Sequence, residues 1–402
     1  MPTELATLAK LAADDRALIQ QVPLSRVWQA SQRAHLRVHL FITGETHRIL
    51  GEFAKQMSAE ILDAANRDGM LDAMGVHRVQ SEMERAWGKV IAEWKTLFYQ
   101  AREETAAAPF AVMAAEHARV LVPAIEAVAN KSESRRDRLE SLREFTEASP
   151  TDVTYVFDPQ LKAVMDAAAN RVYPDKLKLS QRIWNLDQNS RYGISNVLYN
   201  GIANSKSAWD IAKDLEAYLG AGKDCPRWTW ARLYNLTKKE IATGDTRGLL
   251  RGDECDGRGV AYNALRVART EISAVHAMAT EDAMARMPWI EKEQFNLSKA
   301  HPVKDICDDW AKGGEGGQGI YKKGTIKLPL HPHDLCFVTS VQMEPDKFTA
   351  NVRAWMRGED TRSGFARGMD QYAAMMRGAG NVVKVVQIAL PGVVGNLSPA
   401  YQ

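Results

Sequence analysis

Apolar side chains recur every three or four positions through the first third of the chain, which is the spacing of an amphipathic helix. The first such run covers residues 3–22, and Thr3 is placed to act as its N-cap. Three more helical runs follow at Trp28–Leu62, Val76–Tyr99 and Ala106–Val128. Gly and Pro are sparse in this part, so we expect helices that pack mainly on one another.

A polar stretch ends this helical region. Residues Lys131–Arg143 are polar on almost every face, which indicates either a solvated helix or a linker. Pro150 then interrupts the chain, so we place a domain boundary at residues 148–149. The stretch TYVFDPQL, at residues 154–161, is predicted to be a short extended piece that opens the next region.

Two further helices are expected in that region, at Lys176–Ile202 and Ala208–Leu219. The second has clear end signals, because Ser205 or Ser207 can act as its N-cap and Gly220 can stop it. Its apolar positions form one stripe, which predicts a helix with a single buried face.

Residues 221–257 break the helical pattern, since Gly, Asp and Arg are frequent there. We interpret them as an insertion with a short helix of its own at Trp230–Ile241. A long helix follows from Ala261 to Met287, where apolar residues again recur every three or four positions.

After the long helix the pattern changes to the alternation of apolar and polar residues that is typical of strands. Ile290–Leu297 is the clearest strand, and shorter strand-forming pieces lie at Gly319–Tyr321 and Cys336–Val341. Pro345–Arg377 is predicted to be helical, and Val382–Leu390 is predicted to be a strand or an extended arm.

These elements predict a mainly α protein with a smaller α+β C-terminal unit. Long N-terminal helices would pack on a helical domain that ends in a short-stranded, loop-rich module. A chain of 402 residues is too long for one ordinary core. We therefore expect an N-terminal helical domain at residues 1–148, a second domain at 149–344 and a C-terminal helix with an extended tail at 345–402.

Composition and charge narrow the classes of function. The chain is 45% hydrophobic and 25% charged, which is typical of soluble globular proteins, and its net charge of +2 is not that of a strongly basic nucleic-acid binder. Its start lacks the features of a signal peptide, and no apolar run approaches the length of a membrane span, so we expect cytoplasmic synthesis and no membrane. Four cysteines in so long a chain predict reduced thiols rather than a disulfide framework.

Candidate chemistry concentrates in the stretch LPLHPHDLCFV, at residues 328–338. Thiols and imidazoles are the ligand types that zinc prefers, and the candidate zinc ligands are Cys307, His331, His333 and Cys336, with His301 in reserve. The nearby glycine-rich loop lacks a core, for which a metal could substitute. Zinc sites usually contain tight pairs such as CxxC, however, and Cys307 stands alone, so we favour a structural role without metal.

Other interpretations of these residues stay open. Cys307 and Cys336 could form a disulfide, or Cys336 could be a buried strand residue while His331 bonds the loop backbone. Cys336 and His331 could form a nucleophilic pair, although no third group is recognisable. Carboxylates could hold Mg²⁺ in KDICDDW, which contains Asp305, Asp308 and Asp309. The glycines of KGGEGGQG lack the GK[ST] ending of a phosphate loop and indicate a flexible loop.

Several short motifs follow one another in a recognisable order. An Arg-Thr-Glu helix is followed by a strand, a Cys-containing turn, a Gly-Tyr piece and a His-Pro…Cys ending, through Arg269, Thr270, Glu271, Cys307, Gly319, Tyr321, His331, Pro332 and Cys336. Upstream, the helix pair around Gly201, Ser205 and Ile211 belongs to the same pattern. In this order the chain resembles the phage Mu F-like minor head proteins, the head morphogenesis family of tailed phages, over about residues 150–340. The family often has CxxC where this chain has Cys307 alone, and HPxCxC where this chain has HPHDLC.

The resemblance implies a structural role in a virion. It suggests a low-copy head assembly protein, made in the host cytoplasm, that binds the portal protein or a major capsid or scaffold protein. Contact with packaged DNA is a further implication. No enzyme activity and no cofactor is expected, with zinc the one open candidate. The alternative is a metal-dependent enzyme that processes nucleic acid, with its site in the Asp305–Asp309 and His331–Cys336 loops.

The Arg-Thr-Glu signature itself has a simple structural interpretation. Arg269 and Glu271 are two positions apart on a helix, so their side chains do not face each other. We expect each to bond separately to the following loop and to lock the helix to it.

Overall fold

The computed structural model describes residues 24–129, 158–172, 176–220, 259–298, 301, 304–331 and 334–389. In this part of the chain the protein is mainly α-helical, with a three-stranded antiparallel sheet in the C-terminal region, as the sequence predicted. The predicted helices at 3–22 and 230–241, the polar stretch at 131–143, the insertion at 221–257 and the tail beyond 389 lie outside the described residues.

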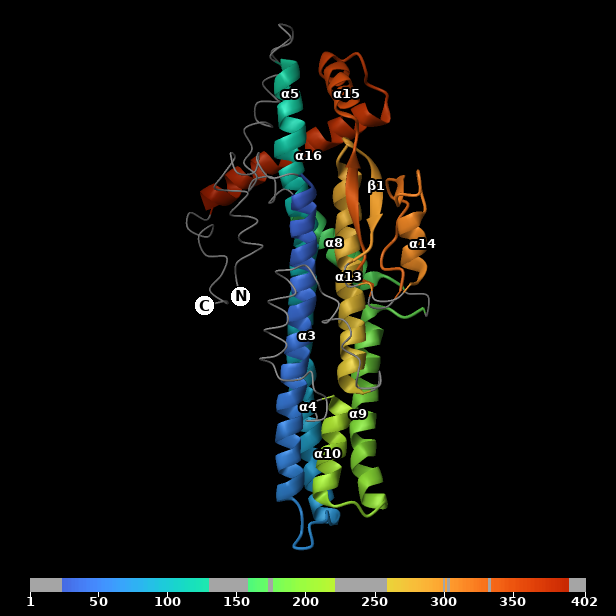
Figure 1. The fold of residues 1–402 in the computed structure, drawn as a ribbon. Coiled ribbons are helices and arrows are strands. Elements are labelled where there is room, and N and C mark those ends of the chain that lie inside the picture. Colours follow the sequence, from blue (N-terminus) through green and yellow to red (C-terminus); the bar gives the residue numbers. More distant parts are fainter. Residues whose placement is uncertain are drawn as a thin grey trace.

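Two long helices run side by side along the whole length of a rod (Figure 1). They are α3 (Leu24–Asp63) and α4 (Ala73–Glu116), and a π-helical turn, His117–Leu121, leads from α4 into α5 (Val122–Ala129). The predicted interruption between Tyr99 and Ala106 is wrong. The intervening AREET has good helix formers, and its Ala and Arg are buried, so the helix continues.

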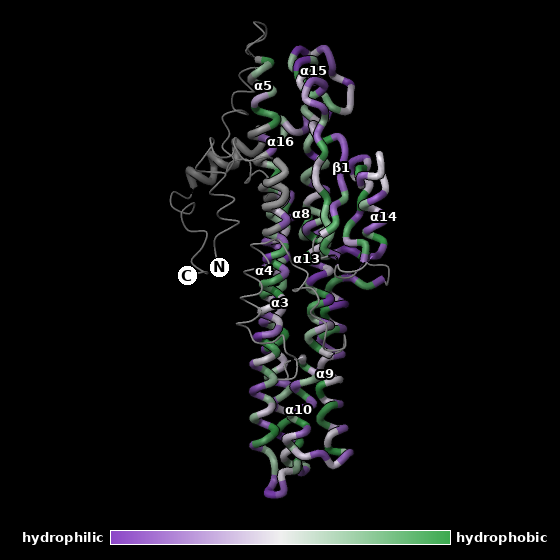
Figure 2. Tube along the Cα trace, in the orientation of Figure 1, coloured by the Kyte–Doolittle hydropathy of each residue, from purple (hydrophilic) through white to green (hydrophobic). Residues whose placement is uncertain are grey.

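Three more helices complete the rod: α9 (Leu179–Ala203), α10 (Ala208–Leu219) and α13 (Val260–Arg286). Their buried faces share one apolar core with α3 and α4, so residues on both sides of the predicted boundary at 148–149 contribute to the same core. Figure 2 shows apolar and hydrophilic residues alternating along these helices, as expected where each helix turns one face to a common core.

The helix α10 illustrates how local signals set an element. The Ser207 hydroxyl accepts a hydrogen bond from the Asp210 backbone N–H at 3.2 Å, which satisfies one of the free donors at the helix start. Gly220 ends the helix in the left-handed conformation, with φ of 76°. The predicted bounds of this helix are confirmed, and its apolar stripe is buried.

The sheet lies beside the C-terminal half of α13 and has the strand order β2-β1-β3. Its strands are β1 (Ile290–Asn296), β2 (Ile320–Lys322) and β3 (Phe337–Gln342), so the three predicted strands are confirmed with bounds shifted by one residue. A short helix, α14 (Ile306–Lys312), sits in the connection between β1 and β2. We call the segment from β1 to β3, residues 290–342, the β module.

Two predictions about extended pieces were wrong. Val382–Ala389 is the last part of α16 (Gly364–Ala389), because extending an existing helix costs little and valine disfavours it by only some tenths of a kcal/mol. Of the predicted extended piece at 154–161, residues 154–157 lie outside the described residues, and Asp158–Leu161 forms the first turn of α8 (Asp158–Asn170), where Pro159 is tolerated. The predicted helix at 345–377 is interrupted at Gly358, where α15 (Pro345–Arg357) ends.

These C-terminal helices close the upper end of the rod. A second apolar cluster joins α4, α5, α8, α13, α15 and α16, and includes Trp289, Phe348, Trp355 and Tyr372. The carboxylate of Glu116 lies buried beneath it and accepts hydrogen bonds from the Trp289 indole at 3.0 Å and the Ser340 hydroxyl at 2.7 Å. In the described part of the chain, no helix combines the length and the apolar character needed to cross a membrane.

Candidate functional site

The β module has a very small core of its own. Four buried residues form it, namely Phe295, Cys307, Ile326 and Cys336, and partly buried side chains such as Trp310 and Tyr321 surround them. Half of this core therefore consists of thiol side chains. Such a core provides little apolar burial, so the packing of the module depends strongly on its polar contacts.

The helix α14 presents Cys307 to this core. Asp305 is the N-cap, and its carboxylate accepts a hydrogen bond from the Cys307 backbone N–H at 2.7 Å. The Asp308 carboxylate bonds back to the Asp305 backbone N–H at 3.1 Å, which completes a capping box. Asp309 is exposed. Two of the three aspartates proposed for Mg²⁺ thus have a structural use at the start of this helix.

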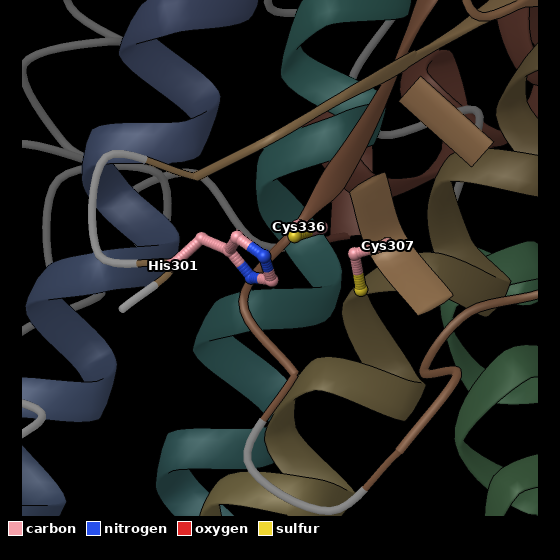
Figure 3. A group of neighbouring side chains, drawn as sticks. All are labelled: His301, Cys307 and Cys336. Atoms are coloured by element: carbon pink, nitrogen blue, oxygen red, sulfur yellow. The ribbon is translucent and has the colours of Figure 1, made fainter. Parts of the chain in front are cut away.

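Three side chains from separate segments lie close together in the β module (Figure 3). His301 comes from the connection after β1, Cys307 from α14, and Cys336 from the residue before β3. Their ligand atoms all lie within 4.8 Å of one another. Cys307 also belongs to a second group, with Asp305 and His331, and the His331 Nε2 atom lies 3.3 Å from the Cys307 sulfur. Cys307 therefore links a His301–Cys336 group to an Asp305–His331 group.

Each imidazole also contacts a carboxylate. The Nε2 atom of His301 lies 3.0 Å from Oδ2 of Asp308. The Nε2 atom of His331 lies 3.3 Å from Oδ2 of Asp305. Carboxylates that contact histidines in this way fix the ring orientation, as they do behind metal-binding histidines.

Asp334 organises the segment that carries Cys336. Its carboxylate is buried and accepts hydrogen bonds from the backbone N–H groups of Leu330 at 2.8 Å and Cys336 at 2.9 Å. Its backbone carbonyl accepts a bond from the Ser273 hydroxyl on α13 at 2.7 Å. Neither Ser273 nor Asp334 was assigned a role from the sequence, although an aspartate two residues before a bonded N–H is an Asx-turn signal.

The two cysteines are free thiols in this structure, so the disulfide considered from the sequence is not formed. The hydrogen bond with Cys336, burial, and the negative charge of Asp334 all raise the pKa of the Cys307 thiol. A thiol held protonated in this way is a poor nucleophile, and a bound dication would be needed to convert it to a thiolate.

The Arg-Thr-Glu signature lies inside the rod. Arg269 and Glu271 are almost fully buried on α13, and Thr270 bonds within its own helix. The Arg269 guanidinium donates a hydrogen bond to the Thr43 hydroxyl on α3 at 3.4 Å. This partner belongs to an N-terminal helix, whereas the sequence predicted a partner in the following loop. The Ser273 hydroxyl on α13 donates a hydrogen bond to the loop, at the Asp334 carbonyl.

Gly319 and Tyr321 fix α14 against the sheet. Gly319 has φ of 68°, and a Cβ there would lie 2.9 Å from the Phe295 carbonyl oxygen, so only glycine is accommodated without strain. The Tyr321 hydroxyl donates to the Trp310 carbonyl at 2.9 Å, and the two rings pack 4.9 Å apart. The predicted flexible loop KGGEGGQG, at residues 312–319, contains four glycines with positive φ in a tight turn. Pro332 and His333 lie outside the described residues.

A small cavity lies between α13 and the segment that carries Cys336. Its volume is about 30 Å³, and it is lined in part by His35, His276 and Asp334. The rings of His35 and His276 stack at 4.2 Å, and His39 approaches His35 at 3.2 Å between Nε2 atoms. Burial lowers the pKa of both His35 and His276, to about 4 for His276, so these imidazoles are neutral at pH 7. The cavity has room for water-sized molecules only.

Comparison with known proteins assigns no family. The chain matches no protein-family model, no curated protein and no solved structure. What can be argued about function therefore depends on the order of the motifs, the shape of the molecule and the geometry of the β module.

Proposed function

We propose that this protein is a minor head component of a tailed phage or phage-derived particle, acting in capsid assembly beside the portal protein or the inner capsid surface. The observation that carries the proposal is the position of the residues on which the resemblance depends. Arg269, Cys307, Gly319, Tyr321 and Cys336 all lie in α13 or in the β module packed against it. Each is buried or fixes backbone geometry, as expected for residues that build an assembly domain.

The shape of the molecule supports the same role. The helices α3 and α4 have 40 and 44 residues, so the rod is about 60 Å long at 1.5 Å per residue. A rod of this length can contact several neighbouring subunits of a particle at once.

Exposed aromatic residues on α9 and α10 offer contact points along this rod. Trp184, Tyr192 and Tyr199 on α9 are 62%, 71% and 47% exposed, and Trp209 on α10 is 56% exposed. Aromatic side chains are enriched in protein interfaces relative to the remaining surface. Portal, major capsid and scaffold proteins are the partners that the proposal names, with packaged DNA as a further contact.

The test is a count of this chain in purified particles. Quantitative mass spectrometry against the major capsid protein is expected to find a few copies of it per particle. Its absence from particles, with the protein left in the lysate, would contradict the proposal.

A second candidate function follows from one further cluster. His301, Asp305 and Asp308 also place three ligand atoms within 4.8 Å of one another, and carboxylates with histidine can hold a divalent cation. This favours the metal-dependent enzyme on nucleic acid as the alternative. Cleavage of DNA by the pure protein that requires Mg²⁺ or Mn²⁺ and disappears in Asp308→Asn would establish it. No cleavage with either metal would exclude it.

A further inference from the structure

We propose that the β module holds a structural zinc ion, with Cys307, Cys336, His301 and His331 as its four ligands. This inference does not depend on the role in a phage head. It starts from Cys307, which lies in two groups of candidate ligands, one with His301 and Cys336 and one with His331. These side chains come from separate segments that only the fold brings together.

The distances suit tetrahedral zinc. With Zn–S of about 2.3 Å and Zn–N of about 2.0 Å, a sulfur and a nitrogen on the same ion lie about 3.5 Å apart. The Cys307 sulfur and the His331 Nε2 atom are 3.3 Å apart. The ligand atoms of His301, Cys307 and Cys336 lie within 4.8 Å of one another, and one bound ion would draw them and His331 closer together.

The surroundings of His301 are those of a metal ligand. Its Nε2 atom lies 3.0 Å from the Asp308 carboxylate. A carboxylate behind a ligating histidine sets the tautomer and the orientation of the ring. Asp308 is itself held by the capping box of α14, so this support is part of the helix start.

His331 is assigned as the fourth ligand in preference to Asp305. Both lie near Cys307, and the two are 3.3 Å apart. The Asp305 carboxylate, however, already accepts the Cys307 backbone N–H as the N-cap of α14. Structural zinc sites are closed by nitrogen and sulfur ligands, which His331 supplies.

The module has a physical need for such an ion. Among its described residues, four buried side chains form its core cluster, and two of these are the cysteines. A zinc ion would connect α14, the connection after β1 and the start of β3 at one point. In small domains with little apolar burial, the free energy of metal binding contributes directly to folding.

The first experiment measures the metal content of the full chain, produced with zinc available and purified under reducing conditions without chelator. About one zinc ion per chain is expected by elemental analysis, falling to near zero in Cys307→Ser and in Cys336→Ser. Exposed His77→Gln is the control for an imidazole and should retain the zinc.

The choice of the fourth ligand has its own pair of variants. His331→Gln should lose most of the zinc, and Asp305→Asn should keep it. Loss in Asp305→Asn with retention in His331→Gln would overturn the assignment of His331.

A readout on the unmodified protein guards against variants that fail to fold. Cobalt replaces zinc in such sites, and the wild-type chain with Co²⁺ should show thiolate-to-metal charge-transfer absorption and the visible bands of tetrahedral coordination. Three results would overturn the zinc site: wild-type protein without zinc that takes up neither metal, a cobalt spectrum without thiolate bands, or a Cys307–Cys336 disulfide in the protein as purified. Zinc that persists in both cysteine variants would do the same.

Discussion

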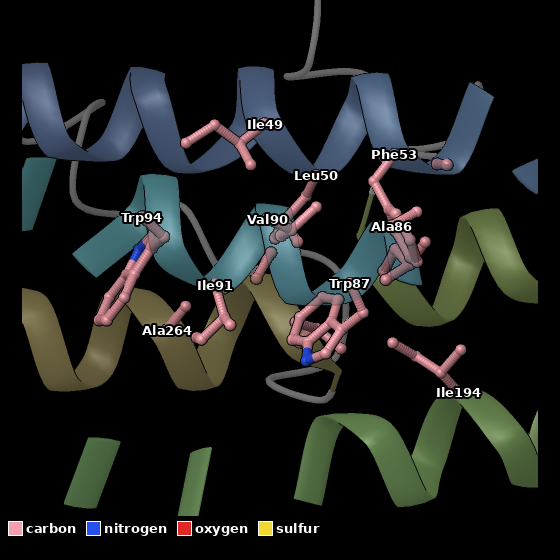
Figure 4. Packing of buried hydrophobic residues seen from close by; sticks show 14 of the residues in the cluster. Ile49, Leu50, Phe53, Ala86, Trp87, Val90, Ile91, Trp94, Ile194 and Ala264 are labelled. Carbon is pink, nitrogen blue, oxygen red and sulfur yellow. The ribbon is translucent and has the colours of Figure 1, made fainter. Parts of the chain in front are cut away.

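The rod and the β module are stabilised in different ways. The core of the rod is continuous across five helices and is built from large apolar side chains, among them Phe53, Trp87, Ile91 and Trp94 (Figure 4). The β module has four buried core residues, and its geometry depends on a buried carboxylate, a tight glycine turn and a cluster of thiols and imidazoles. Apolar burial therefore dominates in one region and directed polar contacts in the other.

This difference has a consequence for how each region responds to change. A large core loses stability in proportion to the volume removed and keeps its fold. A module fixed by a few directed contacts loses its local order when one of them is removed, while the rod beneath it remains folded. Substitutions in each region should therefore distinguish a graded loss of stability in the rod from a local loss of order in the β module.

The largest loss is expected from the core of the rod. Trp94 is buried, stacks on Phe98 at 5.1 Å and donates its indole N–H to Thr46. Trp94→Ala should lower the free energy of unfolding by about 4 kcal/mol. Denaturation followed by circular dichroism measures this. Trp184→Ala, at a 62% exposed position, is the control and should change stability by less than about 0.5 kcal/mol. Equal losses in the two variants would contradict the assigned core.

The next largest effect is expected in the β module. Asp334→Ala leaves the backbone N–H groups of Leu330 and Cys336 without their carboxylate, at a cost of about 3 kcal/mol. Hydrogen exchange should rise around residues 328–342 and stay unchanged in the helices α3 and α4. The exposed Asp309→Ala is the control. Uniform exchange across the whole chain would mean that the module and the rod unfold together.

Acid should weaken the packing of α13 on α3 through His276, whose ring stacks on that of His35. Burial lowers its folded pKa to about 4, below the unfolded value, so the unfolded chain binds the proton first. Stability is full above about pH 6.5 and falls as the pH drops towards 4, by about 2 kcal/mol between pH 7.5 and 5 for this one group. His276→Phe, which keeps a ring against His35, should flatten this part of the pH profile measured by urea denaturation. An unchanged profile would show that His276 is not responsible.

The smallest effect concerns the glycine turn. Gly319→Ala combines a positive φ with a contact to the Phe295 carbonyl, and we expect a loss of about 2 kcal/mol. Gly316 has nearly the same φ, but a Cβ there meets nothing within 4 Å, so Gly316→Ala should cost about 1 kcal/mol. The difference between the two, from thermal unfolding, isolates the close contact. No difference would remove the packing argument for Gly319.

The parts of the fold that the sequence predicted are those with local causes. The bounds of α10 follow from its apolar stripe, Ser207 and Gly220, all within one short stretch. The strands of the β module follow from alternation. The valines near 382 misled the prediction, because β-branched residues express only a weak preference and an existing helix overrides it.

The candidate site was only partly visible in the sequence. Cys307, His331 and Cys336 were named from their chemistry, and the structure places Cys307 beside His301 and Cys336 in one group and beside His331 in another. The contacts that position them join residues far apart, such as Ser273 with Asp334, separated by 61 positions, and Arg269 with Thr43, separated by 226. No local pattern encodes such pairs, which depend on how α13 packs against its neighbours.

The most direct test of this contrast is hydrogen exchange on the full chain with zinc and after removal of metal by a chelator. We expect chelation to increase hydrogen exchange in residues 301–338, while the rod helices α3, α4 and α10 keep their protection. Equal protection of the β module with and without metal would contradict the claim that a side-chain cluster, rather than apolar burial, holds this module together.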